Sequence, residues 1–362
     1  MYTLELTKPD GRQLTLYSRE PLKGIESAPS PFPEPLNRSP HLRWNPLRGE
    51  WVTYAAYRQD RTFLPPPEYN PLAVTVDPAN PTELPKGDWS IAVFDNRFPS
   101  FSLQADEAPD SVVLTEPAIG KCEVVVFTQD TNTSLGNLPL NHIELLLQVW
   151  ADRTEKLGRI PGIEYVLPFE NRGAEVGVTL HHPHGQIYAY PHVPPVPERM
   201  QKNAIDHYQA QGNGVLQSFI QQEIAAGERI LYLGEDAIAF VPACARYPYE
   251  VWVAPIAPVE TFIHLSDAQR TDLARALKTV LLKYEGLWNR PFPYLMAWYQ
   301  APTDGRPHPE SHLHAAFYPP YRTRDRLKYL AGTELAAGWF AMDALPEEKA
   351  RELQQVEINI DL

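Results

Sequence analysis

A faint internal repeat limits the folds that this chain can adopt. Each half of the sequence predicts a strand, a helix and two further strands, in the same order. In the first half the predicted strands cover residues 122–128, 163–170 and the run 182–190, with a helix from about Leu140; in the second half they cover 249–254, 294–299 and 312–316, with a helix after Ser266. Two copies of one β-α-β-β unit therefore predict an α+β fold.

The helix of each unit has a possible start signal. Asn141 with Glu144 has the spacing of a capping-box variant, and Ser266 is followed by Gln269 at the same spacing. After Ser266, apolar residues recur at helical spacing and predict a buried helix face made by Leu273, Leu277, Val280, Leu281 and Tyr284.

Proline-rich stretches divide the chain. Of its 38 prolines, many lie in the segments 29–40, 65–71 and 191–197. Proline fixes φ and removes a backbone donor, so these stretches predict extended connections. The last stretch lies between the two units, and we expect it to join an N-terminal domain, residues 1–193, to a C-terminal domain, residues 194–362.

Three histidines and a glutamine lie within six residues, in the run His181-His182-Pro183-His184-Gly185-Gln186. In a strand, His182, His184 and Gln186 would share one face. Neutral imidazole is a nucleophile near pH 7, and an amide donor can stabilise charge on the group under attack, so phosphorus is a suitable target. The alternatives are a metal site, because closely spaced histidines bind zinc, or a polar strand edge.

Composition excludes several classes of protein. The net charge of −13 argues against a nucleic-acid partner, because binding to the phosphate backbone needs a basic surface. No apolar run approaches the length of a membrane span, and the charged N-terminus does not resemble a signal peptide. The cysteines, Cys122 and Cys244, are far apart in sequence, which is typical of a reducing compartment. We therefore expect a cytoplasmic protein without a membrane partner.

The motif and its flanks resemble a known family. Asn171, Gly177 and the run His182–Gln186 are similar to the active-site signature of galactose-1-phosphate uridylyltransferase, in the histidine-triad superfamily. Further similar segments cover most of the chain: 41–51, 94–99, 312–320 and 328–334. The resemblance implies two histidine-triad-like domains in tandem, each an antiparallel sheet with packed helices. The second copy is degenerate, because Ala316 stands where the first has Gln186.

The resemblance also implies a mechanism. His184 would attack the α-phosphorus of a UDP-hexose such as UDP-glucose, forming a uridylyl-histidine and releasing hexose 1-phosphate. A second hexose 1-phosphate, such as galactose 1-phosphate, would then take the uridylyl group, in a ping-pong reaction of galactose metabolism. Gln186 would donate to the phosphoryl oxygens. His182 would hold the loop through its backbone carbonyl, which would accept from the other ring nitrogen of His184 and fix the tautomer.

The same family positions imply a set of substrate contacts: Arg58, Arg61, Asn96, Phe98, Asn171, Gly177, Val178, Thr179, His312, His314, Lys328 and Glu334. Several have a structural alternative. The two arginines and Lys328 have the pattern of solvated surface charges, Asn96 and Phe98 that of a turn and a core aromatic, and His312 and His314 that of buried polar groups. The family further implies a homodimer whose second subunit contributes Lys328 and Glu334.

No metal or other cofactor is expected. Zinc-bearing members of the family use a cysteine pair with two histidines, and the matching region, which we place at residues 80–88, has no cysteine. A second metal site of some relatives needs histidines where this chain has Tyr299 and Ala316. The zinc and iron sites of these relatives are therefore expected to be lost.

Two other functions stay open. One is a phosphorylase of the same superfamily, in which phosphate accepts the nucleotidyl group from ADP-glucose or a dinucleoside polyphosphate. The other is a non-catalytic nucleotide-binding module. The presence of both His184 and Gln186 argues against the module, because a protein that only binds needs no nucleophile.

Overall fold

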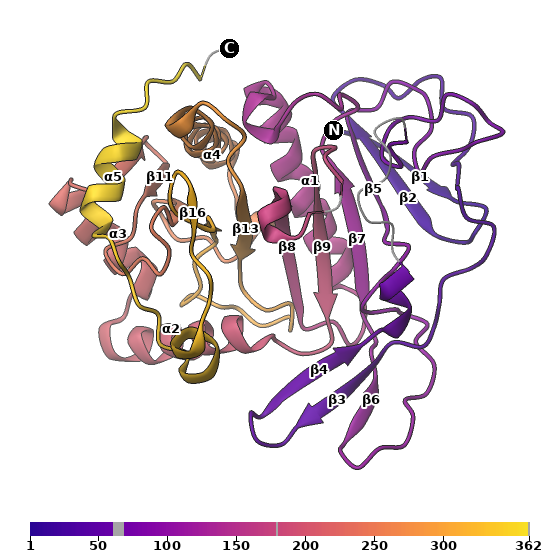
Figure 1. Ribbon diagram of the computed structural model, residues 1–362, viewed down its shortest axis with the longest axis horizontal. Helices are drawn as coiled ribbons and strands as arrows, with labels where there is room; N and C mark the ends of the chain where they lie inside the picture. The colour runs from indigo at the N-terminus through magenta and orange to yellow at the C-terminus, as the bar shows by residue number, and fades with distance from the viewer. Residues whose placement is uncertain (61–68, 179, 361–362) are drawn as a thin grey trace.

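One large sheet organises the computed structural model, which describes residues 1–60, 69–178 and 180–360 (Figure 1). Eleven described strands form it, and all neighbouring pairs are antiparallel. In spatial order they are β1 (Tyr2–Thr7), β2 (Gln13–Ser18), β5 (Ile91–Asp95), β7 (Lys121–Val126), β9 (His184–Tyr190), β8 (Tyr165–Arg172), β13 (Tyr294–Tyr299), β14 (His314–Tyr318), β12 (Val251–Pro255), β11 (Ala237–Phe240) and β10 (Ile230–Leu233).

The strand order shows how the two predicted repeats are joined. The first repeat contributes the order β7-β9-β8 and the second the mirrored order β13-β14-β12. The repeats meet between β8 and β13, where Asn171 pairs with Leu295. The motif strands β9 and β14 consequently occupy equivalent places, each between the other two strands of its repeat. The predicted tandem of β-α-β-β units is confirmed.

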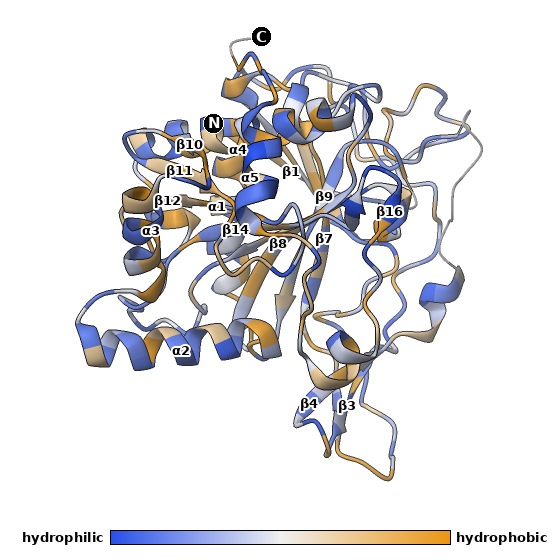
Figure 2. Cartoon of the chain, turned by 60° about the vertical axis from the view of Figure 1, so that its left-hand side comes forward, coloured by the Kyte–Doolittle hydropathy of each residue, from blue (hydrophilic) through white to orange (hydrophobic). Residues whose placement is uncertain are grey.

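Two long helices, α1 (Leu140–Gly158) and α4 (Asp267–Trp288), cover one face of this sheet. Their apolar side chains share a core with inward residues of both repeats, among them Ile187 of β9 and Phe317 of β14. In Figure 2 hydrophobic residues concentrate in the central strands, whereas helix α5 (Pro346–Gln354) is largely hydrophilic. Because side chains alternate along a strand, burial of Ile187 against the helices directs His184 and Gln186 to the opposite face.

Different segments cover that opposite face in the two halves. Over the first half, the long N-terminal segments contribute Leu72, Leu84 and Trp89 to a cluster with Val126. Over the second half lie α2 (Pro195–Gln211) and α3 (Val215–Ala226), and α3 packs Leu216 and Ile220 on β11 and β12. None of these covering elements was predicted from the sequence.

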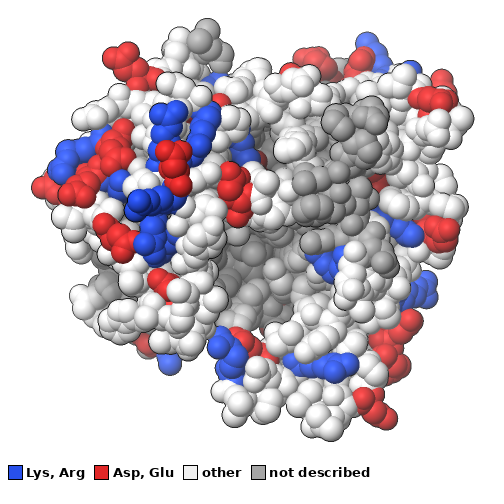
Figure 3. Space-filling model, in the orientation of Figure 1, with Lys and Arg blue, Asp and Glu red and all other residues white. Residues whose placement is uncertain are grey.

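A smaller sheet projects from the main body, at the bottom of Figure 1. Its order is β4-β3-β6, and a separate hairpin joins β15 to β16. These strands are β3 (His41–Asn45), β4 (Glu50–Tyr54), β6 (Thr115–Pro117), β15 (Tyr321–Thr323) and β16 (Arg326–Leu327). On the face seen in Figure 3, acidic and basic side chains are interspersed. In the described part of the chain, no helix combines the length and the apolar character needed to cross a bilayer.

Both long helices begin where the sequence predicts, but only one of the two predicted capping boxes is present. Ser266 Oγ accepts from the Gln269 amide at 3.2 Å, and Gln269 Oε1 accepts from the Ser266 amide at 3.0 Å, which completes the capping box of α4. Helix α1 instead begins directly after Pro139, without a side-chain cap. Asn141 therefore lies within the first helical turn. Glu144 instead accepts a hydrogen bond from Arg19, which directly follows β2.

Candidate active site

The strand β9 presents His184 and Gln186, both half-buried, on the face opposite α1. Gly185 between them points to the helix side, where a Cβ atom would lie 2.8 Å from the Phe127 ring and 2.8 Å from the Phe169 carbonyl oxygen. Ordinary side chains cannot fit at that spacing. The glycine of the motif is therefore required for close packing of β9 on its neighbours.

The tautomer of His184 follows from one hydrogen bond. Its Nδ1 lies 2.7 Å from the backbone carbonyl oxygen of His182, which is the contact predicted from the sequence. A carbonyl oxygen can only accept, so Nδ1 carries the proton and Nε2 carries a lone pair. Burial lowers the pKa of His184 below its ordinary value, which keeps the ring neutral near pH 7. Nε2 is therefore available as a nucleophile.

His182 lies outside the strand, so the predicted row of three side chains is reduced to two on β9. Its ring is buried, and both nitrogens have partners: Nε2 lies 2.7 Å from the Thr128 carbonyl oxygen, and Nδ1 lies 3.0 Å from Asn70 Nδ2. Asn70 was not predicted from the sequence. It lies in the proline-rich stretch 65–71, where a lone asparagine has the pattern of an ordinary turn residue.

The surroundings of His182 do not fit a metal ion. A metal at either ring nitrogen would have to displace the Thr128 carbonyl or the Asn70 amide, both within hydrogen-bond distance. Among residues 1–60, 69–178 and 180–360, no cluster of three or more histidine, cysteine, aspartate or glutamate side chains could hold an ion. We therefore derive no step through a metal.

A chain of contacts joins Gln186 to three other predicted residues. Asn96 Nδ2 donates to Gln186 Oε1 at 3.4 Å, and Asn96 Oδ1 accepts from the Phe98 amide at 2.9 Å. The carbonyl of Phe98 in turn accepts from Arg58 Nη1. Because Oε1 of Gln186 faces Asn96, its amide nitrogen is left to donate elsewhere. The structure thus brings Arg58, Asn96, Phe98 and Gln186 together on one side of β9.

The end of β8 and the turn that follows it contain three further predicted residues. Asn171 Oδ1 is buried and has no hydrogen-bond partner among the described residues, which is unusual for a buried acceptor. Gly177 ends a short turn with φ of 80°, a left-handed conformation that favours glycine whatever the ligand. Val178 donates its amide to the Gly173 carbonyl at 3.3 Å. Two other predicted contacts, Arg61 and Thr179, lie outside the described residues.

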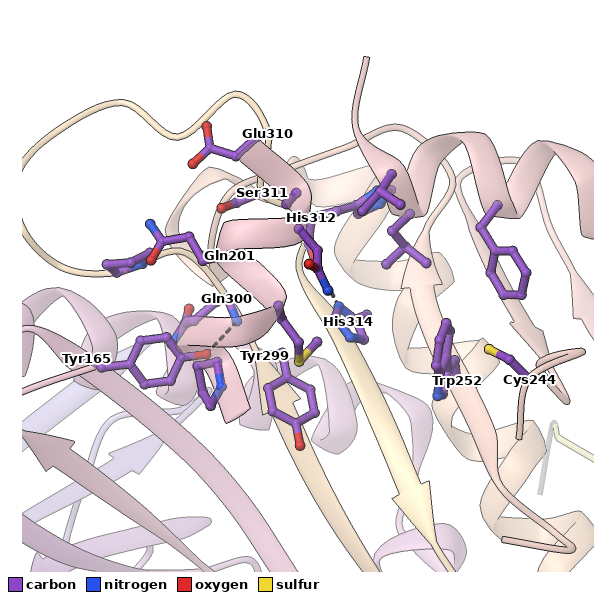
Figure 4. A pocket seen from close by; sticks show the side chains of 18 residues that line it. Tyr165, Gln201, Cys244, Trp252, Tyr299, Gln300, Glu310, Ser311, His312 and His314 are labelled. Atoms are coloured by element: carbon purple, nitrogen blue, oxygen red, sulfur yellow. Dashed lines mark hydrogen bonds between the residues drawn. The ribbon is translucent and has the colours of Figure 1, made fainter. Parts of the chain in front are cut away.

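The second repeat keeps the same backbone frame. His314 Nδ1 lies 2.8 Å from the His312 carbonyl oxygen, and His312 Nε2 lies 2.8 Å from the Pro255 carbonyl oxygen. Burial lowers the pKa of both rings to about 4. They line a cavity of about 340 Å³ together with Trp252 and Tyr299 (Figure 4). His312 and His314 thus lie in the second repeat's own cavity.

Lys328 and Glu334 pair with each other. Lys328 Nζ lies 3.5 Å from Glu334 Oε1 and donates to the Ala341 carbonyl at 2.7 Å, and both side chains are buried. The alternative of a solvated surface lysine is therefore wrong. Within the chain these two residues stabilise the segment that follows β16.

Comparison with known proteins identifies the family. The family model described as galactose-1-phosphate uridyl transferase, N-terminal domain, matches residues 32–194. The family model of the C-terminal domain matches residues 200–361. The galactose-1-phosphate uridylyltransferase of Thermotoga maritima is 38% identical over 88% of this chain and 99% of its own length. The rat enzyme of that name is 31% identical, with 87% of each chain covered.

Solved structures agree. A chain described as a uridylyltransferase mutant superposes with a TM-score of 0.79 at 30% identity, covering 87% of this chain and 97% of its own. An ADP-glucose phosphorylase from Arabidopsis thaliana, solved with bound ADP-glucose, has a TM-score of 0.66 at 23% identity, with 88% and 100% covered, and this likeness concerns the fold alone. The resemblance drawn from the motif is confirmed: the chain belongs to the galactose-1-phosphate uridylyltransferase family.

Proposed function

We propose that this chain is a UDP-glucose–hexose-1-phosphate uridylyltransferase that moves UMP between UDP-glucose and galactose 1-phosphate. The observation that carries the proposal is the hydrogen bond from His184 Nδ1 to the His182 carbonyl at 2.7 Å. It leaves an unprotonated Nε2 on a ring that burial keeps neutral. A module that only binds nucleotides has no need of such a nucleophile.

The reaction follows from this geometry. Nε2 of His184 forms a bond to the α-phosphorus of UDP-glucose, and the bond to the β-phosphate oxygen breaks, with its electron pair leaving on glucose 1-phosphate. This leaving group is a stable anion near neutral pH, so it requires no strong acid. The uridylylated ring is a cation, and its remaining Nδ1–H still donates to the His182 carbonyl, which stabilises the charge. Galactose 1-phosphate then attacks the same phosphorus and restores the imidazole.

The surrounding side chains have proposed roles in binding. Gln186, whose Oε1 faces Asn96, donates its amide to a phosphoryl oxygen. The guanidinium of Arg58, held by the Phe98 carbonyl, supplies positive charge for the substrate phosphates. The unpartnered Oδ1 of Asn171 accepts from the nucleotide. We assign Arg61, Gly177, Val178 and Thr179 to the same site by family position.

Two further parts of the proposal rest on the family and on the composition. The enzyme acts as a homodimer, with Lys328 and Glu334 of one subunit contributing to the sugar-phosphate site of the other. The free thiols of Cys122 and Cys244 are in keeping with a cytoplasmic location. The reaction needs no metal.

Intact-protein mass spectrometry tests the proposal. The protein is incubated briefly with UDP-glucose, and separately with ADP-glucose, in the presence of a chelator. A uridylyl adduct that maps to His184 and is removed by galactose 1-phosphate is the expected result. His184→Gln should form no adduct, whereas His314→Gln, the matched change in the second repeat, should still be uridylylated.

Other outcomes decide against parts of the proposal. An adenylyl adduct that inorganic phosphate removes would make the protein a phosphorylase. Formation of the adduct only without chelator would contradict metal independence. Absence of any adduct from either donor would favour the binding module.

A further inference from the structure

Asn70 contacts the ring that precedes the nucleophile. Its Nδ2 lies 3.0 Å from His182 Nδ1. The direction of the amide is fixed, because Asn70 Oδ1 accepts from the backbone amide of Leu72 at 3.0 Å. The group that faces His182 is therefore the NH2 donor, and His182 Nδ1 must be the acceptor.

This contact defines the polarity of a whole hydrogen-bond chain. With Nδ1 accepting, the proton of the neutral His182 ring is on Nε2, which donates to the Thr128 carbonyl at 2.7 Å. The backbone carbonyl of His182 then accepts from His184 Nδ1 at 2.7 Å. If His182 Nδ1 were protonated, its N–H would face the N–H donor of the Asn70 amide, and the hydrogen bond would be lost. Asn70 thus disfavours the charged form of a ring two residues from the nucleophile.

The second repeat provides an internal comparison. His312 and His314 keep the two equivalent contacts, to the Pro255 carbonyl and to the His312 carbonyl, each at 2.8 Å. His312 Nδ1, however, is buried and has no hydrogen-bond partner among the described residues. The backbone frame of the loop therefore forms without a donor at this nitrogen. The repeat that has the donor is the one that also has Gln186.

We propose that Asn70 is a positioning residue for catalysis: its amide holds the His182 ring neutral and in one orientation, and so presents His184 Nε2 for attack. The proposal rests on the uridylyl transfer proposed above. It assigns Asn70 a role through His182, without contact to the substrate.

The test uses two variants of Asn70. Asn70→Asp is nearly isosteric and keeps an oxygen to accept from the Leu72 amide, so the turn is retained while the atom facing His182 changes from donor to acceptor. Asn70→Ala removes the donor, so that His182 Nδ1, like His312 Nδ1, has no hydrogen-bond partner among the described residues. Asn80→Ala is the matched control, because it removes an exposed amide contact, to Asp77 Oδ2 at 3.1 Å, in the same N-terminal segment.

The single-turnover rate of uridylylation by UDP-glucose should fall at least tenfold in Asn70→Asp at pH 6.5, with little change in the half-saturating concentration. The loss should shrink as the pH rises, since a carboxylate at position 70 favours a protonated His182. The other ionisable groups that face this ring are Asp130 and His184, and both are unchanged in the variant. Asn70→Ala should show a smaller loss, and Asn80→Ala none.

Nitrogen-15 NMR of the histidine rings measures the protonation of His182 directly and does not depend on enzyme activity. The wild-type protein should show His182 as the Nε2–H tautomer and Asn70→Asp should show it doubly protonated at pH 6.5. Wild-type pH profiles and an unchanged His182 tautomer in both variants would overturn the proposal. A loss of rate in proportion to lost folded protein, without a change in pH dependence, would also overturn it. Failure of the wild-type protein to be uridylylated would instead count against the proposed function.

Discussion

The amide of Gln186 is the clearest place to measure the electrostatic part of catalysis. Gln186→Ala removes the amide that we propose donates to the phosphoryl oxygens, and loss of one such donor in comparable sites costs about 3 kcal/mol, or roughly a hundredfold in rate. The fold should tolerate the change, because Ala316 occupies the equivalent position in β14, where it pairs with Ala297 and Trp252. The expected loss is therefore chemical.

Asn96→Ala supplies the comparison. Its contact with Gln186 Oε1 is long, at 3.4 Å, so losing it should cost only about 0.5 kcal/mol, or roughly twofold through this contact. The assay is rapid-quench measurement of the uridylyl-enzyme formed from UDP-glucose, with thermal denaturation as the check on folding. A Gln186→Ala enzyme within fivefold of the wild-type rate would refute the reasoning. Equal losses in the two variants would show that Asn96 does more than orient the amide.

Three more predictions concern pH and stability. Because burial lowers the pKa of His184 below 6.5, the rate of uridylylation should reach half its maximum below pH 6.5 and should not change at higher pH. A midpoint above pH 6.5 in the rapid-quench rates would contradict this. Glu170 accepts a hydrogen bond from Tyr294, and burial raises the pKa of the Glu170 carboxyl to about 7. The carboxyl therefore binds its proton more tightly in the folded chain than in the unfolded one. The free energy of unfolding should therefore lose a component as the pH rises from about 4.5 to 7, and urea titrations of Glu170→Gln should lack that loss. Glu123→Ala removes the carboxylate that lies 2.6 Å from the buried guanidinium of Arg153, which then keeps the longer contact to Asp152 at 3.9 Å. The free energy of unfolding in urea titrations should therefore fall by about 3 kcal/mol, and a fall under about 1 kcal/mol would refute this reasoning.

The repeat could be read from the sequence because its strands and helices have regular periodicity. The strand at 294–299 was predicted at its observed limits, and the capping box of Ser266 is present. The edge strands β1 and β10 and the helices α2 and α3 were missed. Their positions depend on which surface of the main sheet remains to be covered, and this is decided by tertiary packing that no local pattern records.

The local part of the site could be predicted, whereas the contacts made by residues distant in sequence could not. The hydrogen bond from His184 to the His182 carbonyl was expected from the resemblance of the motif to the family. Asn70 could not be predicted, because 112 residues separate it from His182 and its own neighbourhood has the pattern of a turn. Likewise, nothing local indicates that the long segment before β5 closes over the face that carries the nucleophile.

The retained frame around His314 has a use in protein engineering. Its ring already has a fixed tautomer, set by the same backbone contact that serves the nucleophile. One feature separates it from a working centre, because Ala316 supplies no amide. The rings of Tyr299 and Trp252, whose centroids lie 5.3 and 5.9 Å from that of His314, line the same cavity. Ala316→Gln would add the missing amide beside this second imidazole on the existing scaffold. One chain could then carry two independently tunable reaction centres on a single sheet.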